Sequence, residues 1–120
     1  MNTPRAIASL SALAHEHRLA VYRHLVERGP EGLPAGVIAE RVGLVPSSLT
    51  FHLQHLQRAG LVSQRRLGRQ LIYAVDFAAM TDLVAYLTEN CCAQAGASCA
   101  SACQPATTVA KPVKKARRAS

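Results

Sequence analysis

Apolar residues recur at every third or fourth position through most of the first half of the chain, a spacing that predicts amphipathic α-helices. Thr3 and Pro4 open the first pattern as a cap and a first helical residue. Glycine ends the next three patterns, at Gly29, Gly43 and Gly60. Four helices are therefore expected, at about residues 4–13, 15–28, 34–42 and 46–59.

The period changes after Gly60. The segment LVSQRRLGRQLIYAVD is rich in β-branched and aromatic residues around a turn at 67–70, which predicts a β-hairpin of residues 62–66 and 71–75. Helical periodicity then returns and carries the last predicted helix to Cys91 and Cys92. Because only Leu44 and Val45 lie between Gly43, which ends the third pattern, and Pro46, which opens the fourth, this order predicts a mainly α fold with a small β-hairpin, a winged helix-turn-helix.

The fourth predicted helix has an apolar stripe and a polar face. Leu49, Leu53 and Leu56 form the stripe on a helical wheel. Hydroxyl and amide groups in the first turns of such a helix can read base edges in the major groove, and Phe51 suits contact with a thymine methyl. The alternative is an ordinary solvated surface on which Phe51 covers a neighbour. The candidate DNA-binding residues are Ser47, Ser48, Thr50, Phe51 and Gln54.

Three arginines gather at the predicted hairpin turn. Arg65, Arg66 and Arg69 stand around Gly68, which permits a tight bend. Their guanidinium groups can reach DNA phosphates or an adjacent minor groove, whereas a merely solvated turn rarely needs three of them. The hairpin therefore strengthens the prediction that double-stranded operator DNA is a partner.

The composition indicates one domain at residues 1–103 and a disordered basic tail at 104–120. Hydrophobic residues make up 49% of the 120, enough for a core. The tail supplies five of the fourteen Lys and Arg residues, so residues 1–110 carry nine positive and seven negative charges, or +2. The tail either keeps the chain soluble or attracts DNA phosphates. A cytoplasmic protein without a membrane partner is expected, because no long apolar run and no secretory signal pattern occur.

The segments ALAHEHRLAVYRHL, PSSLTFHLQHLQRAGLV and RRLGRQLIYAV resemble the ArsR/SmtB family of metal-responsive winged-helix repressors, over about residues 5–92. The resemblance implies a homodimer built from the first and last helices, with two recognition helices about 34 Å apart on an inverted repeat. The family commonly has two consecutive histidines where this chain has Phe51 and His52, so base preference does not transfer. We interpret His52, beside the leucine stripe, as a packed structural histidine rather than a base reader. The expected dimer interface is Leu10, Met80, Leu83, Val84 and Leu87, with an intrachain core as the alternative for the last four.

All four cysteines lie in the segment NCCAQAGASCASAC, residues 90–103. In a reducing compartment such a cluster indicates metal binding or redox sensing before a disulfide staple. The chain lacks the Cys-x-Cys that many relatives use for arsenic at the third helix, and the histidine that zinc sites on the last helix use. The segment instead resembles the subgroup of arsenic(III)-responsive members with a vicinal Cys-Cys at the end of the last helix.

Trivalent arsenic or antimony is soft and accepts three thiolates, whereas zinc prefers four ligands. The expected inducer ligands are Cys91, Cys92 and Cys99, and Cys103 either replaces Cys99, completes a zinc or cadmium site, or has no ligand role. Two thiols alone would satisfy monomethylated arsenic(III). The expected function is a repressor that leaves its operator when the inducer binds; a thiol redox sensor or a zinc- or cadmium-sensing repressor of the same fold is the alternative.

An enzyme is not expected, because the chain has no Cys-x-x-Cys and no Cys-x5-Arg loop, and no organic cofactor is implied. His15, His17 and His24 on the second helix could flank a metal ion, but we interpret them as surface or core residues.

Overall fold

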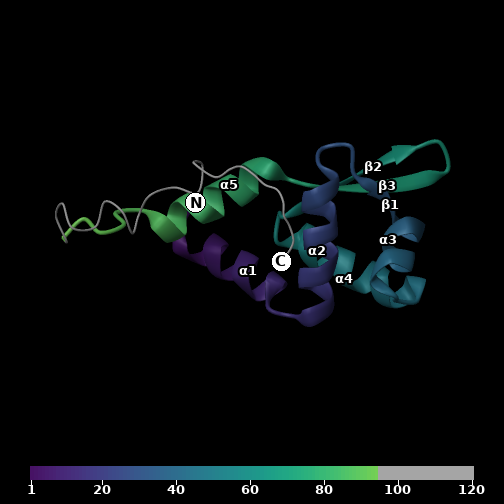
Figure 1. Ribbon diagram of the computed structural model, residues 1–120, viewed down its shortest axis with the longest axis horizontal. Coiled ribbons are helices and arrows are strands. Elements are labelled where there is room, and N and C mark those ends of the chain that lie inside the picture. The colour runs from purple at the N-terminus through teal and green to yellow at the C-terminus, as the bar shows by residue number, and fades with distance from the viewer. Residues whose placement is uncertain (95–120) are drawn as a thin grey trace. The chain divides into compact units, whose positions relative to one another are not determined.

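The computed structural model describes residues 1–94, of which Met1–Leu87 form one compact unit. The predicted helices and hairpin are all present, which confirms the mainly α winged helix-turn-helix fold with a small antiparallel sheet (Figure 1). None of the helices described is long and apolar enough to cross a membrane. The elements in chain order are α1 (Thr3–Leu13), α2 (Glu16–Arg28), β1 (Leu33–Pro34), α3 (Ala35–Val42), α4 (Pro46–Arg58), β2 (Val62–Leu67), β3 (Gln70–Val75) and α5 (Phe77–Thr88).

The cap of α1 differs from the expectation, and α2 has a side-chain cap that was not predicted. Asn2, not Thr3, caps α1: its side-chain oxygen accepts a hydrogen bond from the backbone N–H of Arg5 at 3.0 Å. His15 caps α2 in the same way, because its Nδ1 accepts from the backbone N–H of His17 at 3.1 Å. Each cap satisfies one of the amides that a helix N-terminus leaves without an intrahelical partner.

The sheet contains a short strand that the sequence pattern did not predict. β1 has two residues and therefore no alternation to detect, and it pairs antiparallel with β3, Leu33 opposite Tyr73. The strand order is β1-β3-β2. β2 and β3 pair along their whole length as far as Leu67 opposite Gln70, and Gly68, with φ of +64°, allows the two-residue turn between them.

The core fixes the orientation of α4. Leu49, Leu53 and Leu56 are each at most 1% exposed, as the predicted stripe requires. They belong to one apolar cluster with Val21 and Leu25 of α2 and with residues of α3 and all three strands. Since burial of each leucine side chain contributes about 1.5–3 kcal/mol, the inner face of α4 is held firmly and its outer face is presented in a fixed orientation.

The apolar residues expected at a dimer interface divide into two groups. In the single chain, Leu10 of α1 and Val84 and Leu87 of α5 are 43%, 55% and 57% exposed. Leu83 is only 6% exposed and Met80 is half-buried against the core. The structure therefore places Leu83 in the chain's own packing, which was the alternative interpretation of that residue.

The last helix ends earlier than predicted. α5 stops at Thr88, so Cys91 and Cys92 lie in the turns that follow it rather than in its last turn. Asn90, with φ of +61°, adopts the left-handed conformation that commonly ends a helix. Cys99, Cys103 and the basic tail at 104–120 lie outside the described residues.

Candidate nucleic-acid interface

The outer face of α4 carries most of the predicted DNA-binding side chains. Ser47, Thr50, Phe51 and Gln54 are exposed and follow one another at spacings of three and four along the helix, while Ser48 is half-buried at the edge of this face. The opposite face lies in the core. We call Ser47, Thr50, Phe51 and Gln54 the α4 outer stripe, and it presents a continuous polar and aromatic surface.

Two members of the stripe, Thr50 and Phe51, have contacts within the chain that determine which of their groups remain accessible to a binding partner. The Thr50 hydroxyl donates to the Pro46 carbonyl oxygen at 3.0 Å, which leaves its methyl group and its oxygen lone pair for an outside partner. Phe51 is 54% exposed and stands edge-on to His52 and His55, with ring centroids 5.7 and 5.2 Å away. The aromatic ring is thus supported from behind while its far side faces solvent.

The N-terminus of α4 has no side-chain cap. Val45 is the N-cap residue and makes no side-chain hydrogen bond, so the first-turn amides of α4 have no side-chain acceptor. Such amides, together with the positive end of the helix dipole, suit a phosphate oxygen. The helical pattern did not predict this feature, although an apolar residue before Pro46 was the available signal.

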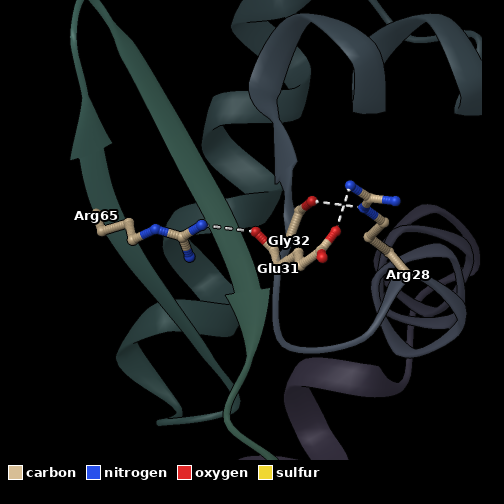
Figure 2. Close-up of polar contacts among 4 residues, drawn as sticks. All are labelled: Arg28, Glu31, Gly32 and Arg65. Carbon is tan, nitrogen blue, oxygen red and sulfur yellow. Dashed lines mark hydrogen bonds and ion pairs between the residues drawn. The ribbon is translucent and has the colours of Figure 1, made fainter.

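The wing is the β2–β3 hairpin, and its arginines have different roles. Arg65 of β2 reaches across β3 and donates from Nη2 to the Glu31 carbonyl oxygen at 2.8 Å (Figure 2). From the end of α2, Arg28 forms an ion pair with the Glu31 carboxylate at 2.7 Å and donates from Nε to the Gly32 carbonyl oxygen at 3.0 Å (Figure 2). Arg65 therefore links the wing to the loop between α2 and β1.

Arg66 and Arg69 differ from Arg65 in this respect. Both are exposed, and neither side chain has a hydrogen-bonding or ion-pair partner among residues 1–94. Arg66 also points to the opposite face of β2 from Arg65, because successive side chains of a strand alternate. The three arginines were predicted as one group, and the structure instead assigns one to a contact within the chain and leaves two available for a partner.

The thiol segment is described as far as Gln94. Cys91 and Cys92 are both exposed, and their Sγ atoms are 3.7 Å apart. Cys92 has φ of +58°, a left-handed conformation that is uncommon for a residue other than glycine. No three His, Cys, Asp or Glu side chains within the described part of the chain are placed to hold a metal ion.

The histidines group differently from the sequence interpretation. His15 and His17 lie beside His52 of α4, whereas His24 is not part of this group. His52 is 8% exposed, in agreement with its interpretation as a packed residue. Burial lowers the pKa of His52 below its ordinary value of 6.5, and nearby His15 and other basic groups lower it further.

Comparison with known proteins identifies relatives of this arrangement. A family model described as a helix-turn-helix domain matches residues 13–65. The transcriptional activator HlyU of Vibrio cholerae is 32% identical over 75 residues, which cover 62% of this chain and 67% of HlyU. The chain spans about two thirds of the length of the curated relatives that it matches.

Solved structures agree with the sequence matches. Reduced HlyU superposes with a TM-score of 0.56 and 31% identity, over 70% of this chain and 88% of HlyU. An ArsR-like transcriptional regulator from Rhodococcus superposes with a TM-score of 0.65 and 25% identity, over 84% of this chain and 92% of that protein. A third structure is a homodimeric winged helix-turn-helix DNA-binding domain from Mycobacterium bovis, a possible ArsR-family regulator. It superposes with a TM-score of 0.58 and 26% identity, over 72% of this chain and 81% of that domain.

These matches extend beyond the helix-turn-helix itself, since the Rhodococcus structure covers 84% of the chain. The relatives are transcriptional regulators rather than enzymes. The chain therefore belongs to the ArsR-like family of winged helix-turn-helix transcriptional regulators.

Proposed function

We propose that this protein is a homodimeric repressor that binds operator DNA through α4 and the wing and leaves it when trivalent arsenic or antimony binds its thiols. The observation that carries DNA binding is the α4 outer stripe. Its four side chains are exposed on a helix whose other face is almost fully buried. A helix fixed in this way can enter the major groove without further ordering.

The chemistry of the stripe fits base edges. The amide of Gln54 can both donate and accept, as adenine requires, and the hydroxyl of Ser47 can do the same. Phe51 and the methyl group of Thr50 suit a thymine methyl. Ser48 lies at the edge of the stripe, so it is better placed to contact the DNA backbone than the base edges. The amides at the start of α4 and the guanidinium groups of the wing would then hold phosphates and set the register.

The wing arginines give a test with an internal comparison. Replacing Arg66 or Arg69 with alanine is expected to weaken DNA binding and to reduce the slope of log K against log salt by about one for each phosphate that the variant no longer binds. Arg65→Ala is expected to change the slope less, because its guanidinium group is held by the Glu31 carbonyl oxygen. Anisotropy titrations of the three variants at several salt concentrations measure these slopes. An Arg65→Ala slope that falls as far as the other two would contradict the division of roles.

The homodimer rests on the exposed apolar residues of α1 and α5. Ile7 and Leu10 of α1 and Val84 and Leu87 of α5 are between 43% and 60% exposed in a single chain. The two helices are also joined by a hydrogen bond between the hydroxyls of Thr3 and Tyr86. Burying these residues against a second copy would remove them from water, and the related domain from Mycobacterium bovis is homodimeric.

Leu87→Glu is expected to dissociate this dimer. Each copy loses about 1.5–3 kcal/mol of apolar burial, so the dimer dissociation constant should rise about a hundredfold or more. Light scattering would then report a mass near the 12.8 kDa of one chain at concentrations where the parent is a dimer. Leu19→Glu is the matched control, because Leu19 is 45% exposed on α2, outside the proposed interface. Equal dissociation by both variants, or by neither, would contradict this interface.

The inducer proposal is supported by the thiol pair and its place in the chain. Two thiolates bound to one ion at about 2.3 Å and near-tetrahedral angles lie about 3.8 Å apart, and the Sγ atoms of Cys91 and Cys92 are 3.7 Å apart. Cys92 is disulfide-bonded in the structure, and once it is reduced two thiols at this spacing can share one soft ion. We propose Cys99 as the third ligand, or Cys103 in its place.

The proposed release mechanism uses the continuity of the chain. Cys91 follows the end of α5 by three residues, and α5 carries half of the proposed interface. Closing three thiolates around one ion would restrain the segment and alter how α5 meets its partner, and hence the separation of the two copies of α4. An inducer shifts this equilibrium only by its preference for the DNA-free state, typically by about 1–3 kcal/mol.

One observation favours a second candidate, the thiol redox sensor. Cys92 is disulfide-bonded, and not to Cys91, whose Sγ lies 3.7 Å away. A disulfide at Cys92 would remove one thiolate from the inducer site and could itself restrain the segment. Release of DNA by peroxide but not by arsenite would select this candidate, and release by zinc or cadmium alone would select a four-ligand metal sensor.

A further inference from the structure

Three histidines from two parts of the chain meet behind the α4 outer stripe. His15 caps α2, His17 lies in its first turn, and His52 lies in the middle of α4. The His15 and His52 rings have centroids 4.7 Å apart, and His17 lies 5.5 Å from His15 and 5.7 Å from His52. We call these three residues the histidine cluster.

His52 is the buried member of the cluster, at 8% exposure, and its Nδ1 has no hydrogen-bonding partner within the described residues. In a neutral imidazole this nitrogen can remain a bare lone pair. Protonation would give it an N–H with no acceptor and would add a charge to a buried ring. The surroundings of His52 therefore suit its neutral form.

The charged and titratable groups around His52 reinforce this preference. His15, Arg18 and His17 face it from α2 and the cap of α2, and His55 faces it from α4 itself. All four lower the pKa of His52, and no carboxylate among the described residues acts on it. A proton on His52 would thus join a group of basic side chains without a counter-charge.

The position of His52 connects the histidine cluster to the stripe. It stands between Phe51, which faces outward, and Leu53, which lies in the core. Arg18 is fixed, because its Nε donates to the Ala12 carbonyl oxygen at 2.7 Å. Because Arg18 is held in this way, moving His52 away from it would reduce the repulsion, and His52 belongs to α4.

We propose that the histidine cluster is a proton-sensitive device that displaces α4 and weakens DNA binding on acidification. This inference rests on the proposed DNA-binding function. No three ligands within residues 1–94 are placed to hold a metal ion, so the ligand assigned to the histidine cluster is a proton.

The direction of the pH dependence follows from which state of the protein, native or displaced, binds the His52 proton more tightly. The pKa of His52 is lowered in the folded chain, so the unfolded or displaced state binds more protons at the same pH. The native position of α4 is then fully favoured above about pH 6.5 and becomes less favoured as the pH falls below that value. DNA affinity should fall with it, by up to about tenfold per pH unit for each proton taken up.

Charge alone predicts the opposite result. The chain has five histidines, and protonating them adds positive charge that strengthens attraction to DNA phosphates. We would measure anisotropy of the full chain on DNA from its own promoter between about pH 8 and about pH 5.5, at constant ionic strength with a chelator present. Parent protein and the control variant His24→Gln should lose about tenfold or more in affinity, whereas His52→Gln should hold or gain affinity. If the parent bound DNA more tightly as the pH fell, or if His52→Gln lost as much affinity as the parent, the proposal would be overturned.

A second measurement needs neither DNA nor a variant. NMR titration of the histidine rings in the parent protein should show His52 titrating below pH 6.5, with the α4 amide signals shifting in parallel. If His52 titrated at or above pH 6.5, or if the α4 amide signals did not shift with it, the proposed proton-sensitive role of the histidine cluster would be overturned. Failure to bind DNA even at about pH 8 would instead contradict the proposed function, and the NMR result would still decide the role of the histidine cluster.

Discussion

Replacing Cys91 with serine is expected to abolish the release of DNA by arsenite while leaving DNA affinity within about twofold of the parent. A serine hydroxyl is a poor ligand for a soft ion, so the site loses one of its three sulfurs. Cys91 is exposed and lies outside the compact unit that holds α4 and the wing, and such surface substitutions change stability by about 0.5 kcal/mol or less. In the parent, arsenite should weaken DNA binding about 5- to 150-fold.

The measurement is an anaerobic arsenite titration of reduced protein on labelled DNA, after removal of the reductant. Cys92→Ser should behave as Cys91→Ser does. Cys99→Ser and Cys103→Ser, made separately, should identify the third ligand, since only one of them is expected to lose the response. A Cys91→Ser protein that fails to bind DNA would sink the separation of sensing from binding, and one that still releases DNA would remove Cys91 from the site.

Gly32→Ala is expected to destabilise the protein by about 2–5 kcal/mol. Gly32 has φ of +74°, and a left-handed residue with a Cβ costs about 1–2 kcal/mol. A Cβ at this position would also overlap the Tyr73 carbonyl oxygen and lie 3.0 Å from Ile72 Cγ2, which adds about 1–3 kcal/mol. Because Tyr73 pairs with Leu33, relief of the overlap would push β1 away from β3. Urea unfolding measures the loss.

Gly43→Ala is the matched control for that prediction. Gly43 also has a positive φ, +71°, but a Cβ there meets nothing within 4 Å, so only the backbone cost of about 1–2 kcal/mol is expected. Equal losses of unfolding free energy in the two variants would show that the close approach of Gly32 to β3 adds nothing to the cost of a Cβ at that position. Gly32→Ala should also weaken DNA binding, because the carbonyl oxygen of neighbouring Glu31 accepts from Arg65 and so links the wing to this loop.

The elements that sequence predicts well here are those that repeat a local pattern. The leucine stripe of α4 spans about two turns, and the same residues are among the most deeply buried in the part of the chain that the structure describes. β1 could not be found this way, because two residues carry no period and their pairing with β3 depends on residues far along the chain. The end of α5 was misplaced for a related reason: apolar spacing continued to Cys91, while the left-handed Asn90 ended the helix.

Contacts between distant segments account for what was missed in the candidate site. The stripe follows from helical spacing alone. The separation of Arg65 from Arg66 and Arg69 depends on the Glu31 carbonyl oxygen, which belongs to another loop. His52 meets His15 and His17 only because α2 and α4 share a core. Strand alternation was the one signal that could have separated Arg65 from Arg66 in advance.

The central claim is that α4 and the wing bind a specific DNA sequence. Its most direct test is anisotropy of the reduced protein on DNA from its own promoter, compared with a scrambled duplex of the same length at physiological salt. The account predicts binding to the promoter about a thousandfold or more tighter than to the scrambled duplex. Equal affinity for the two duplexes, or no binding to either, would contradict it.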